Sequence, residues 1–261
     1  MGYSVVGEGD PIAMPAVWFH QIQKDLTTPT WGHWMAETAR GRRLVRSDFR
    51  GVGLSEPEPP RWDFEALLDD FIAVVDDAGL EHFDVLGMSH GVLVAIAYAA
   101  RYPERVRKLA LIGGYAAGFG VRGDPEEVKR RETLLELGRG YAPSDRLSFA
   151  RMLGALYWPS AGGEMIAWFG DRLGTISVLS EALQDVFRVL DLREDLAKVR
   201  APTLIMHSRG DRIIPAACSE EMAAGIPGSK LVLLDSDNHV PLADEPAWPV
   251  ARTALRQFLR S

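Results

Sequence analysis

Short apolar runs alternate along the chain with longer segments in which apolar residues recur at helical spacing. The clearest helical segment is Phe64–Ala78, whose apolar stripe predicts a helix with one buried face. Strands that alternate with helices form parallel sheets covered on both faces, so the pattern predicts an α/β fold. The expected strands are Tyr3–Val6, Pro11–Met14, Arg43–Ser47, Phe83–Leu86, Val106–Ile112, Thr203–Ser208 and Lys230–Leu234.

The strand pattern stops between about residues 118 and 198, and helical segments are expected there near Glu126–Leu137, Asp145–Leu156 and Thr175–Leu190. Insertions at the carboxyl edge of such sheets carry specificity elements. We therefore expect a helical cap over residues 118–198 and a core formed by residues 1–117 and 199–261. Five apolar residues of this segment either line a substrate pocket or only join the cap to the core: Tyr157, Trp158, Met165, Trp168 and Phe169.

Two glycines, Gly87 and Gly91, flank Ser89 where an apolar strand meets an alanine-rich helical run, Val92–Tyr102. A serine in G-x-S-x-G between a strand and a helix occupies a tight, strained turn, the nucleophile elbow, which exposes its hydroxyl. A side chain at either glycine would crowd the neighbouring strand or helix. We therefore predict that Ser89 is a nucleophile and that the backbone N–H of His90 helps to bind an oxyanion.

A nucleophilic serine needs an acid and a base on later loops of the same sheet edge. Asp211 follows a late strand, and His239 follows the last strand. The carboxyl ends of parallel strands meet at one edge, so residues far apart in sequence converge there. The sequence therefore predicts a triad of Ser89, His239 and Asp211.

Alternatives to this triad stay open at the level of sequence. Aspartate is common in turns after strands, so Asp211 has a purely structural explanation as well. Asp235 and Asp237 compete for the acid role, although they share the loop of His239 and would approach its ring from the wrong side. The other histidines do not follow the last expected strand, and we expect each to be packed or at the surface: His20, His33, His82, His90 and His207.

Three further segments carry a resemblance to a known family. Residues 48–55 match the loop pattern D-x-R-G-x-G-x-S, residues 102–106 read Y-P-E-R-V after the elbow helix, and residues 241–246 read P-L-A-D-E-P after His239. With the elbow and the order of the triad, these motifs resemble the α/β-hydrolases over nearly the whole chain. The resemblance implies that fold, with its mostly parallel sheet and an inserted cap. It also disfavours dehalogenase and epoxide hydrolase activity, because those relatives carry a carboxylate at the elbow.

A narrower resemblance concerns domain organisation. Residues 29–31 and 97–106 are similar to hydrolase modules that are joined to cyclase or helix-turn-helix regulatory domains. We expect no such domain in this chain, which leaves a stand-alone hydrolase.

The chain departs from the family in the loop that supplies the second oxyanion donor. Many relatives place His-Gly after the third strand, whereas residues 14–19 here read M-P-A-V-W-F. The resemblance therefore implies the backbone N–H of Trp18 as the second donor, with that of Phe19 as the fallback. A missing donor of this kind lowers the rate by about a hundredfold to a thousandfold.

The composition adds limits on partners and compartment. The 261 residues carry 29 basic and 36 acidic side chains, a net charge of −7, which argues against nucleic acid or an anionic membrane as the main partner. The lone cysteine, Cys218, excludes an internal disulfide and makes a cysteine-based metal site unexpected. The first residues lack a signal-peptide pattern and no run reaches 18 apolar residues, so we expect a cytoplasmic protein. The sequence does not indicate the oligomeric state.

These observations predict a hydrolase that needs no metal or organic cofactor. Ser89 would attack the carbonyl carbon of a small to medium apolar ester or lactone, His239 would take its proton, and Asp211 would hold the imidazolium. The same triad suits hydrolysis of a C–C bond in a diketone, or cofactor-free perhydrolysis of an acid. A third alternative is a ligand-sensing module that binds a small apolar molecule with little turnover.

Overall fold

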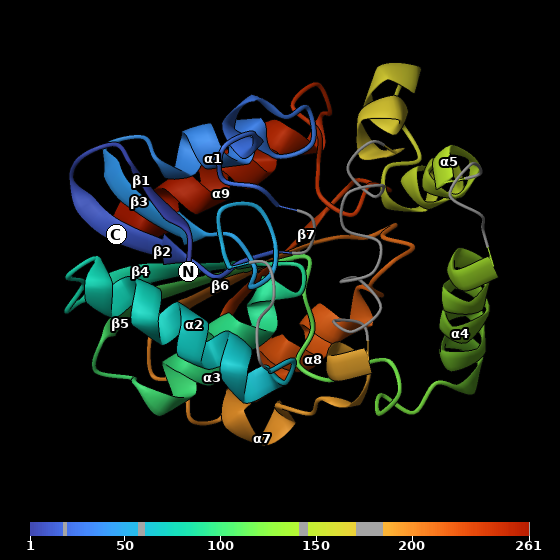
Figure 1. The fold of residues 1–261 in the computed structure, drawn as a ribbon. Helices are drawn as coiled ribbons and strands as arrows, with labels where there is room; N and C mark the ends of the chain where they lie inside the picture. The colour runs from blue at the N-terminus through green and yellow to red at the C-terminus, as the bar shows by residue number, and fades with distance from the viewer. Residues whose placement is uncertain (18–19, 57–60, 141–145, 171–184, 261) are drawn as a thin grey trace.

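The computed structural model describes residues 1–17, 20–56, 61–140, 146–170 and 185–260, and it contains a seven-stranded sheet between layers of helices (Figure 1). The order of the strands is β1-β3-β2-β4-β5-β6-β7; β1 pairs antiparallel with β3, and the other pairs are parallel. The α/β architecture expected from the pattern is thereby confirmed. The strands are β1 Tyr3–Val6, β2 Asp10–Met14, β3 Arg42–Ser47, β4 Phe83–Met88, β5 Val106–Ile112, β6 Thr203–Ser208 and β7 Lys230–Leu234.

Helices cover both faces of the sheet. Helices α1 and α9 lie on one face, and α2, α3, α7 and α8 lie on the other (Figure 1). The start of α2 is fixed by Asp63, whose carboxylate accepts a hydrogen bond from the N–H of Ala66 at 2.8 Å. The helices of these layers are α1 Gly32–Thr38, α2 Phe64–Asp77, α3 Gly91–Arg101, α7 Arg193–Leu196, α8 Ala217–Gly225 and α9 Ala247–Arg260, and a 3₁₀ helix, η1, spans Asp25–Thr27.

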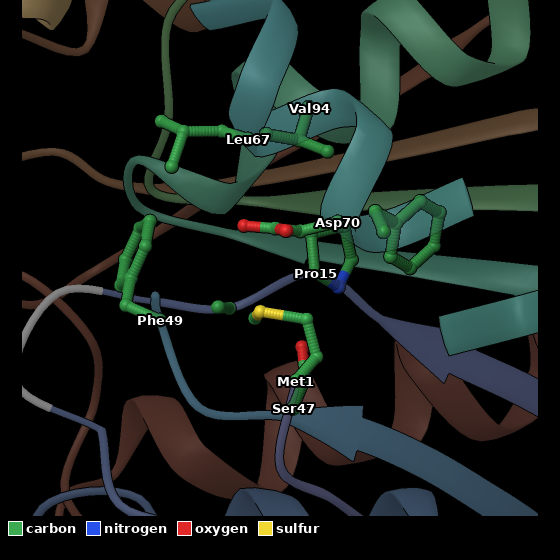
Figure 2. A pocket seen from close by; sticks show the side chains of 9 residues that line it. Met1, Pro15, Ser47, Phe49, Leu67, Asp70 and Val94 are labelled. Atoms are coloured by element: carbon green, nitrogen blue, oxygen red, sulfur yellow. The ribbon is translucent and has the colours of Figure 1, made fainter. Parts of the chain in front are cut away.

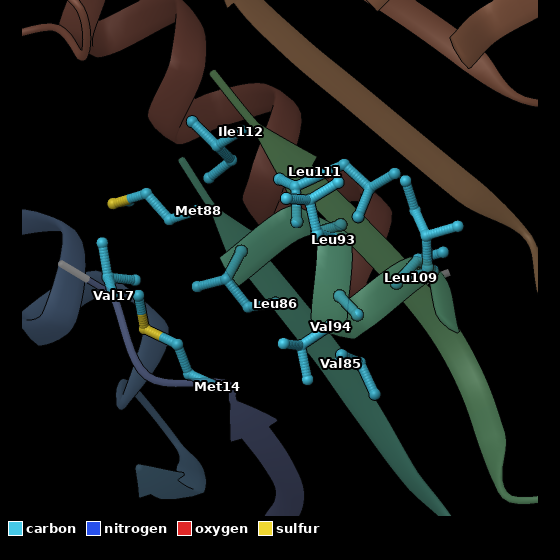
Figure 3. Packing of buried hydrophobic residues seen from close by; sticks show 14 of the residues in the cluster. Met14, Val17, Val85, Leu86, Met88, Leu93, Val94, Leu109, Leu111 and Ile112 are labelled. Carbon is cyan, nitrogen blue, oxygen red and sulfur yellow. The ribbon is translucent and has the colours of Figure 1, made fainter. Parts of the chain in front are cut away.

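Part of the hydrophobic core lies between the sheet and α3, where Leu93 of α3 lies beside Leu111 of β5 (Figure 3). Helices cover β4 on both faces, which explains why its sequence is a continuous apolar run rather than an alternating one. Helix α3 is also buried along nearly its whole length, and its alanines let it lie close to the sheet. This packing fixes the end of β4 relative to the start of α3.

Strand β4 extends beyond the expected Phe83–Leu86, because its pairing continues through a glycine. Gly87 and Met88 pair with Leu111 and Ile112 of β5. The N–H of Ser89 then donates a hydrogen bond to the carbonyl oxygen of Ile112 at 2.9 Å. The turn that carries Ser89 therefore starts from a strand that is held through its last residue.

We call residues 118–198, between β5 and β6, the inserted segment. It contains α4 (Pro125–Gly140), α5 (Arg146–Tyr157) and helical turns at 163–170 and 185–189. Helices α4 and α5 correspond to two of the expected helices, whereas most of the third, Thr175–Leu190, lies outside the described residues. Figure 1 shows α4 and α5 beside the two helical layers rather than within them. The division of the chain into core and cap stays a prediction.

Candidate active site

The turn between β4 and α3 is strained. Of the residues that the structure describes, Ser89 alone among non-glycines has a positive φ, 51°, in a region that L-residues rarely adopt. A Cβ at Gly87 would lie 2.8 Å from the Cβ of Ala95 and 2.9 Å from the Cα of Val92. Glycine is therefore required before Ser89, because α3 begins directly against the strand.

The three residues of the expected triad lie in hydrogen-bond contact. The Nε2 atom of His239 lies 3.0 Å from the Oγ atom of Ser89, and its Nδ1 atom lies 2.7 Å from the Oδ2 atom of Asp211. All three side chains are buried. Since an ionised carboxylate only accepts hydrogen bonds, Nδ1 of His239 carries the hydrogen and the lone pair of Nε2 faces the Ser89 hydroxyl. In this tautomer the imidazole can take the proton of Ser89.

Hydrogen-bond donors surround the carboxylate of Asp211. Its Oδ1 atom accepts from the N–H groups of Ile213 and Ile214 at 2.8 and 3.0 Å, and its Oδ2 atom faces both His239 and, at 3.3 Å, the Nε2 atom of His207. Burial by itself would raise the pKa of Asp211, but the two imidazoles outweigh burial and hold that pKa well below its ordinary value. Asp211 is therefore ionised at neutral pH.

The rival acids are placed differently from Asp211. Asp235 and Asp237 are exposed, and the carboxylate in contact with His239 is the buried one of Asp211. Among the histidines expected to be packed or at the surface, His207 is buried, but it also contacts Asp211. Sequence reasoning missed this contact. The one available signal was the spacing of four residues between His207 and Asp211.

His90 follows Ser89, and its ring is buried against Tyr115 and Phe187, with ring centroids 5.8 and 4.8 Å apart. The Nδ1 atom of His90 lies 3.4 Å from the Oγ atom of Ser89. Burial lowers the pKa of His90 to about 3. Its imidazole is therefore neutral at pH 7 and adds no positive charge beside His239.

The expected oxyanion donors are described only in part. The backbone of His90 stands at the N-cap of α3, the positive end of the helix dipole, where a developing negative charge is stabilised. A Cβ at Gly91 would lie 3.3 Å from the carbonyl oxygen of Ala16, so the loop after β2 runs against the start of α3. Trp18 and Phe19, the expected second donor and its fallback, lie outside the described residues.

A small cavity opens onto Ser89 and His239. Its walls are mainly apolar with few polar groups, which is typical of pockets for small ligands. Tyr157 brings the inserted segment into this wall, whereas Trp158 and Phe169 are buried in the hydrophobic core. The remaining lining residues are Val17, His20, Trp31, Met88 and Val240.

A second small cavity lies between the loop after β2 and helices α2 and α3 (Figure 2). Pro15, Phe49, Leu67 and Asp70 are among its lining residues, and the carboxylate of Asp70 is paired with Arg50 at 2.7 Å. Its lining contains no residue of the predicted triad. The cavity at Ser89 is therefore the candidate active site.

The loop of His239 is tied to the inserted segment by hydrogen bonds. The N–H of His239 donates to the carbonyl oxygen of Tyr157 at 2.7 Å, and the Tyr157 ring stands edge-on to the imidazole. Asn238 donates through Nδ2 to the Oγ atom of Ser160 at 2.6 Å and to Glu245, and its Oδ1 atom accepts from the N–H of Ser160 at 3.2 Å. We call these bonds of Asn238 to Ser160 and Glu245 the Asn238 clamp. The position of the catalytic candidate His239 therefore depends on the end of α5.

The described residues contain neither a metal-binding cluster nor a membrane-spanning helix. None of their His, Cys, Asp and Glu side chains form a group of three or more that could hold a metal ion. No described helix is long and apolar enough to cross a membrane. Cys218 is buried in α8, and burial raises the pKa of its thiol to about 11, so the thiol is uncharged at neutral pH.

Comparisons with known proteins agree with this architecture. A family model described as the alpha/beta hydrolase fold matches residues 16–157. The pimeloyl-[acyl-carrier protein] methyl ester esterase of Neisseria meningitidis is 33% identical over 201 residues, which are 74% of this chain and 75% of that protein. The 2-hydroxy-6-oxo-2,4-heptadienoate hydrolase of Pseudomonas putida is 26% identical over 247 residues, 90% of this chain and 84% of that protein.

Among solved structures, the enol-lactonase from Burkholderia xenovorans LB400 has the same fold. It matches with a TM-score of 0.79 over 100% of this chain and 96% of that chain, at 21% identity. The narrower similarity to modules joined to cyclase or helix-turn-helix domains stays a prediction. The mostly parallel sheet, the solved neighbour and a family match over more than half of the sequence lead to one conclusion: this chain belongs to the α/β-hydrolase superfamily.

Proposed function

We propose that this chain is a serine hydrolase that cleaves a carboxylic ester or lactone of a small to medium apolar substrate through an acyl-enzyme. The observation that carries the proposal is the buried relay in which His239 lies 3.0 Å from the hydroxyl of Ser89 and 2.7 Å from the carboxylate of Asp211. Such a hydroxyl, imidazole and carboxylate suit acyl transfer. The relative named as a methyl ester esterase supports ester chemistry.

The reaction starts at the hydroxyl of Ser89. Its oxygen attacks the carbonyl carbon while Nε2 of His239 takes the proton, so a C–O bond forms and the carbonyl oxygen becomes an oxyanion. The N–H of His90 stabilises that oxyanion, and Asp211 stabilises the imidazolium. When the tetrahedral intermediate collapses, the alcohol leaves with the proton from His239 and Ser89 stays acylated.

Water completes the reaction. His239 takes a proton from the attacking water, a second tetrahedral intermediate forms, and its collapse returns the proton to Ser89 and releases the carboxylic acid. A lactone gives a single hydroxy acid, because its alcohol and acyl parts remain joined. No step uses a metal or an organic cofactor.

The walls of the cavity favour a compact apolar substrate. The cavity is small, and Trp31, Met88 and Val240 make most of its surroundings apolar. Tyr157 contributes both a wall of the cavity and the carbonyl that holds the loop of His239. These contacts support a role for the inserted segment as a cap over the active site.

Labelling with a fluorophosphonate, followed by mass-spectrometric mapping of the modified residue, tests the nucleophile. We expect the label on Ser89 and no label in Ser89→Ala. The matched control is Ser229→Ala, which removes a serine on the loop before β7 and is expected to label like the parent. A panel of esters and lactones of graded chain length then defines the substrate. Equal turnover by Ser89→Ala and the parent would reject the assignment.

A second candidate function breaks a C–C bond with the same residues. The relative named as 2-hydroxy-6-oxo-2,4-heptadienoate hydrolase, similar over 90% of this chain, favours it. Turnover of a diketone with negligible ester turnover would select this function. Peroxidation that requires an added carboxylic acid would instead select perhydrolysis, and tight binding of a small apolar molecule without product would indicate ligand sensing.

A further inference from the structure

A second histidine contacts the acid of the relay. His207, on β6, is buried, and its Nε2 atom lies 3.3 Å from the Oδ2 atom of Asp211. The same oxygen accepts a hydrogen bond from His239 at 2.7 Å. Two imidazoles therefore share one carboxylate oxygen, and the reaction described above uses only one of them.

The neighbours of His207 fix its tautomer. Its Nε2 atom lies 2.8 Å from the carbonyl oxygen of Ile214, which only accepts, so Nε2 carries the hydrogen. Its Nδ1 atom lies 2.5 Å from the Oγ atom of Ser219 in α8, whose hydroxyl donates to the ring lone pair. The Nε2–H of His207 thus points to Ile214, and the Oδ2 atom of Asp211 lies 3.3 Å from the same nitrogen.

The turn after β6 closes these contacts into a ring. Ile214 accepts from His207 through its carbonyl and donates its own N–H to the Oδ1 atom of Asp211 at 3.0 Å. The N–H of Ile213 holds the same oxygen at 2.8 Å. The carboxylate is therefore fixed in rotation, with Oδ2 aimed at both imidazoles.

Resting on the proposed function, we infer that His207 is a positioning residue for the triad. Its N–H fixes the Asp211 carboxylate and draws negative charge from Oδ2, which limits how strongly that oxygen holds the N–H of His239. Two donors that compete for one acceptor weaken each other, so the loss of His207 strengthens the remaining bond. His207 thereby keeps His239 able to return its proton to the leaving group.

The other groups around His239 act differently. Ser89 and His90 face it from the elbow and Tyr157 from the inserted segment, and His20 lines the same cavity from the loop after β2. Burial keeps His90 neutral at pH 7, and it also raises the pKa of Tyr157. On the side of Asp211, Arg131 of α4 donates a hydrogen bond to the carbonyl oxygen of Ile213. The positive charge of Arg131 is unchanged by substitutions at His207 or Ser219.

The test observes the bond between His239 and Asp211 directly, by NMR on the full chain. In His207→Leu, the Nδ1–H resonance of His239 is expected to move downfield. The acid-side midpoint of the pH profile for fluorophosphonate labelling is expected to rise by about half a pH unit. His207→Gln, whose amide N–H can replace that of Nε2, is expected to return both readouts toward the parent.

Two further variants complete the design. Ser219→Ala removes the donor that fixes the tautomer of His207, so a smaller downfield shift in the same direction is expected. His82→Gln replaces an exposed histidine and is the matched control, with an unchanged resonance of His239.

The proposal is overturned if the resonance in folded His207→Leu stays at the parent position, or if His207→Gln behaves like the leucine variant. Should His207→Leu fail to fold, Ser219→Ala decides, because an unshifted resonance there also overturns the proposal. The resonance is observable whether or not any ester is hydrolysed. Absence of ester turnover would therefore reject the proposed function while leaving this test intact.

Discussion

Replacing Asp211 by asparagine keeps the shape of the side chain but puts an NH₂ group among donors. The four groups that contact the carboxylate, from Ile213, Ile214, His239 and His207, all donate. In either rotation, the amide nitrogen of the variant faces at least one N–H. The backbone N–H groups cannot change, so the least costly response is a change of tautomer at His239. Its Nε2 would then carry the hydrogen and could not take the proton of Ser89.

The size of the effect follows from this wrong tautomer. Loss of the carboxylate in an equivalent relay lowers kcat by about 10⁴-fold, which corresponds to about 5 kcal/mol of activation free energy. The free energy of unfolding is expected to fall by only about 1–3 kcal/mol, the usual cost of an unsatisfied buried polar group. Asp211→Asn should therefore be a folded protein with little activity.

The assay is the second-order rate of fluorophosphonate labelling at Ser89, together with kcat/KM for the best ester. Asp235→Asn and Asp237→Asn are matched controls, because both carboxylates are exposed on the loop of His239. We expect these controls to react like the parent. A fall in either rate of less than tenfold in Asp211→Asn would refute the assignment of Asp211. A fall of more than tenfold in either control would refute it as well.

Three further predictions concern stability. Asn238→Ala breaks the Asn238 clamp and leaves Ser160 without its partner, so the free energy of unfolding in urea is expected to fall by about 1–3 kcal/mol; an unchanged value would show that the clamp contributes nothing. Arg46→Met leaves the buried carboxylate of Asp25 without the guanidinium 3.1 Å away, at an expected cost of about 3–5 kcal/mol in the same measurement. The folded pKa of His90 is about 3 and its ordinary value is 6.5, so the unfolded chain binds a proton between these pH values that the folded chain does not, and stability falls as the pH falls through this window. Between pH 7 and pH 4.5, the free energy of unfolding is expected to fall by about 2–3 kcal/mol less in His90→Met than in the parent. An equal fall in both proteins would show that His90 is not the cause of this pH dependence.

The sequence predicted the sheet well because its strands are marked locally. Strands β5, β6 and β7 begin and end where the apolar runs do. Pro202 directly precedes β6, and polar turns follow both β6 and β7. The elbow was recognisable for a similar reason, since the strain at Ser89 requires small neighbours within a few residues. Local constraints of this kind leave a direct trace in the residue order.

The contacts that sequence reasoning missed are not local in this sense. The Asn238 clamp joins residues 78 positions apart, and no pattern in either segment indicates the other. The contact between His207 and Asp211 depends on how the turn after β6 folds back, which the backbone N–H groups of Ile213 and Ile214 determine. Polar side chains of these types occur in many turns, so their roles emerge only in three dimensions.

The attachment of the His239 loop to α5 restricts how new substrate preferences can be engineered. One residue inserted into α5 would turn Tyr157 by about 100° around the helix axis and carry its carbonyl away from His239. A redesign of the inserted segment from this end would therefore change the rate constant together with the preference.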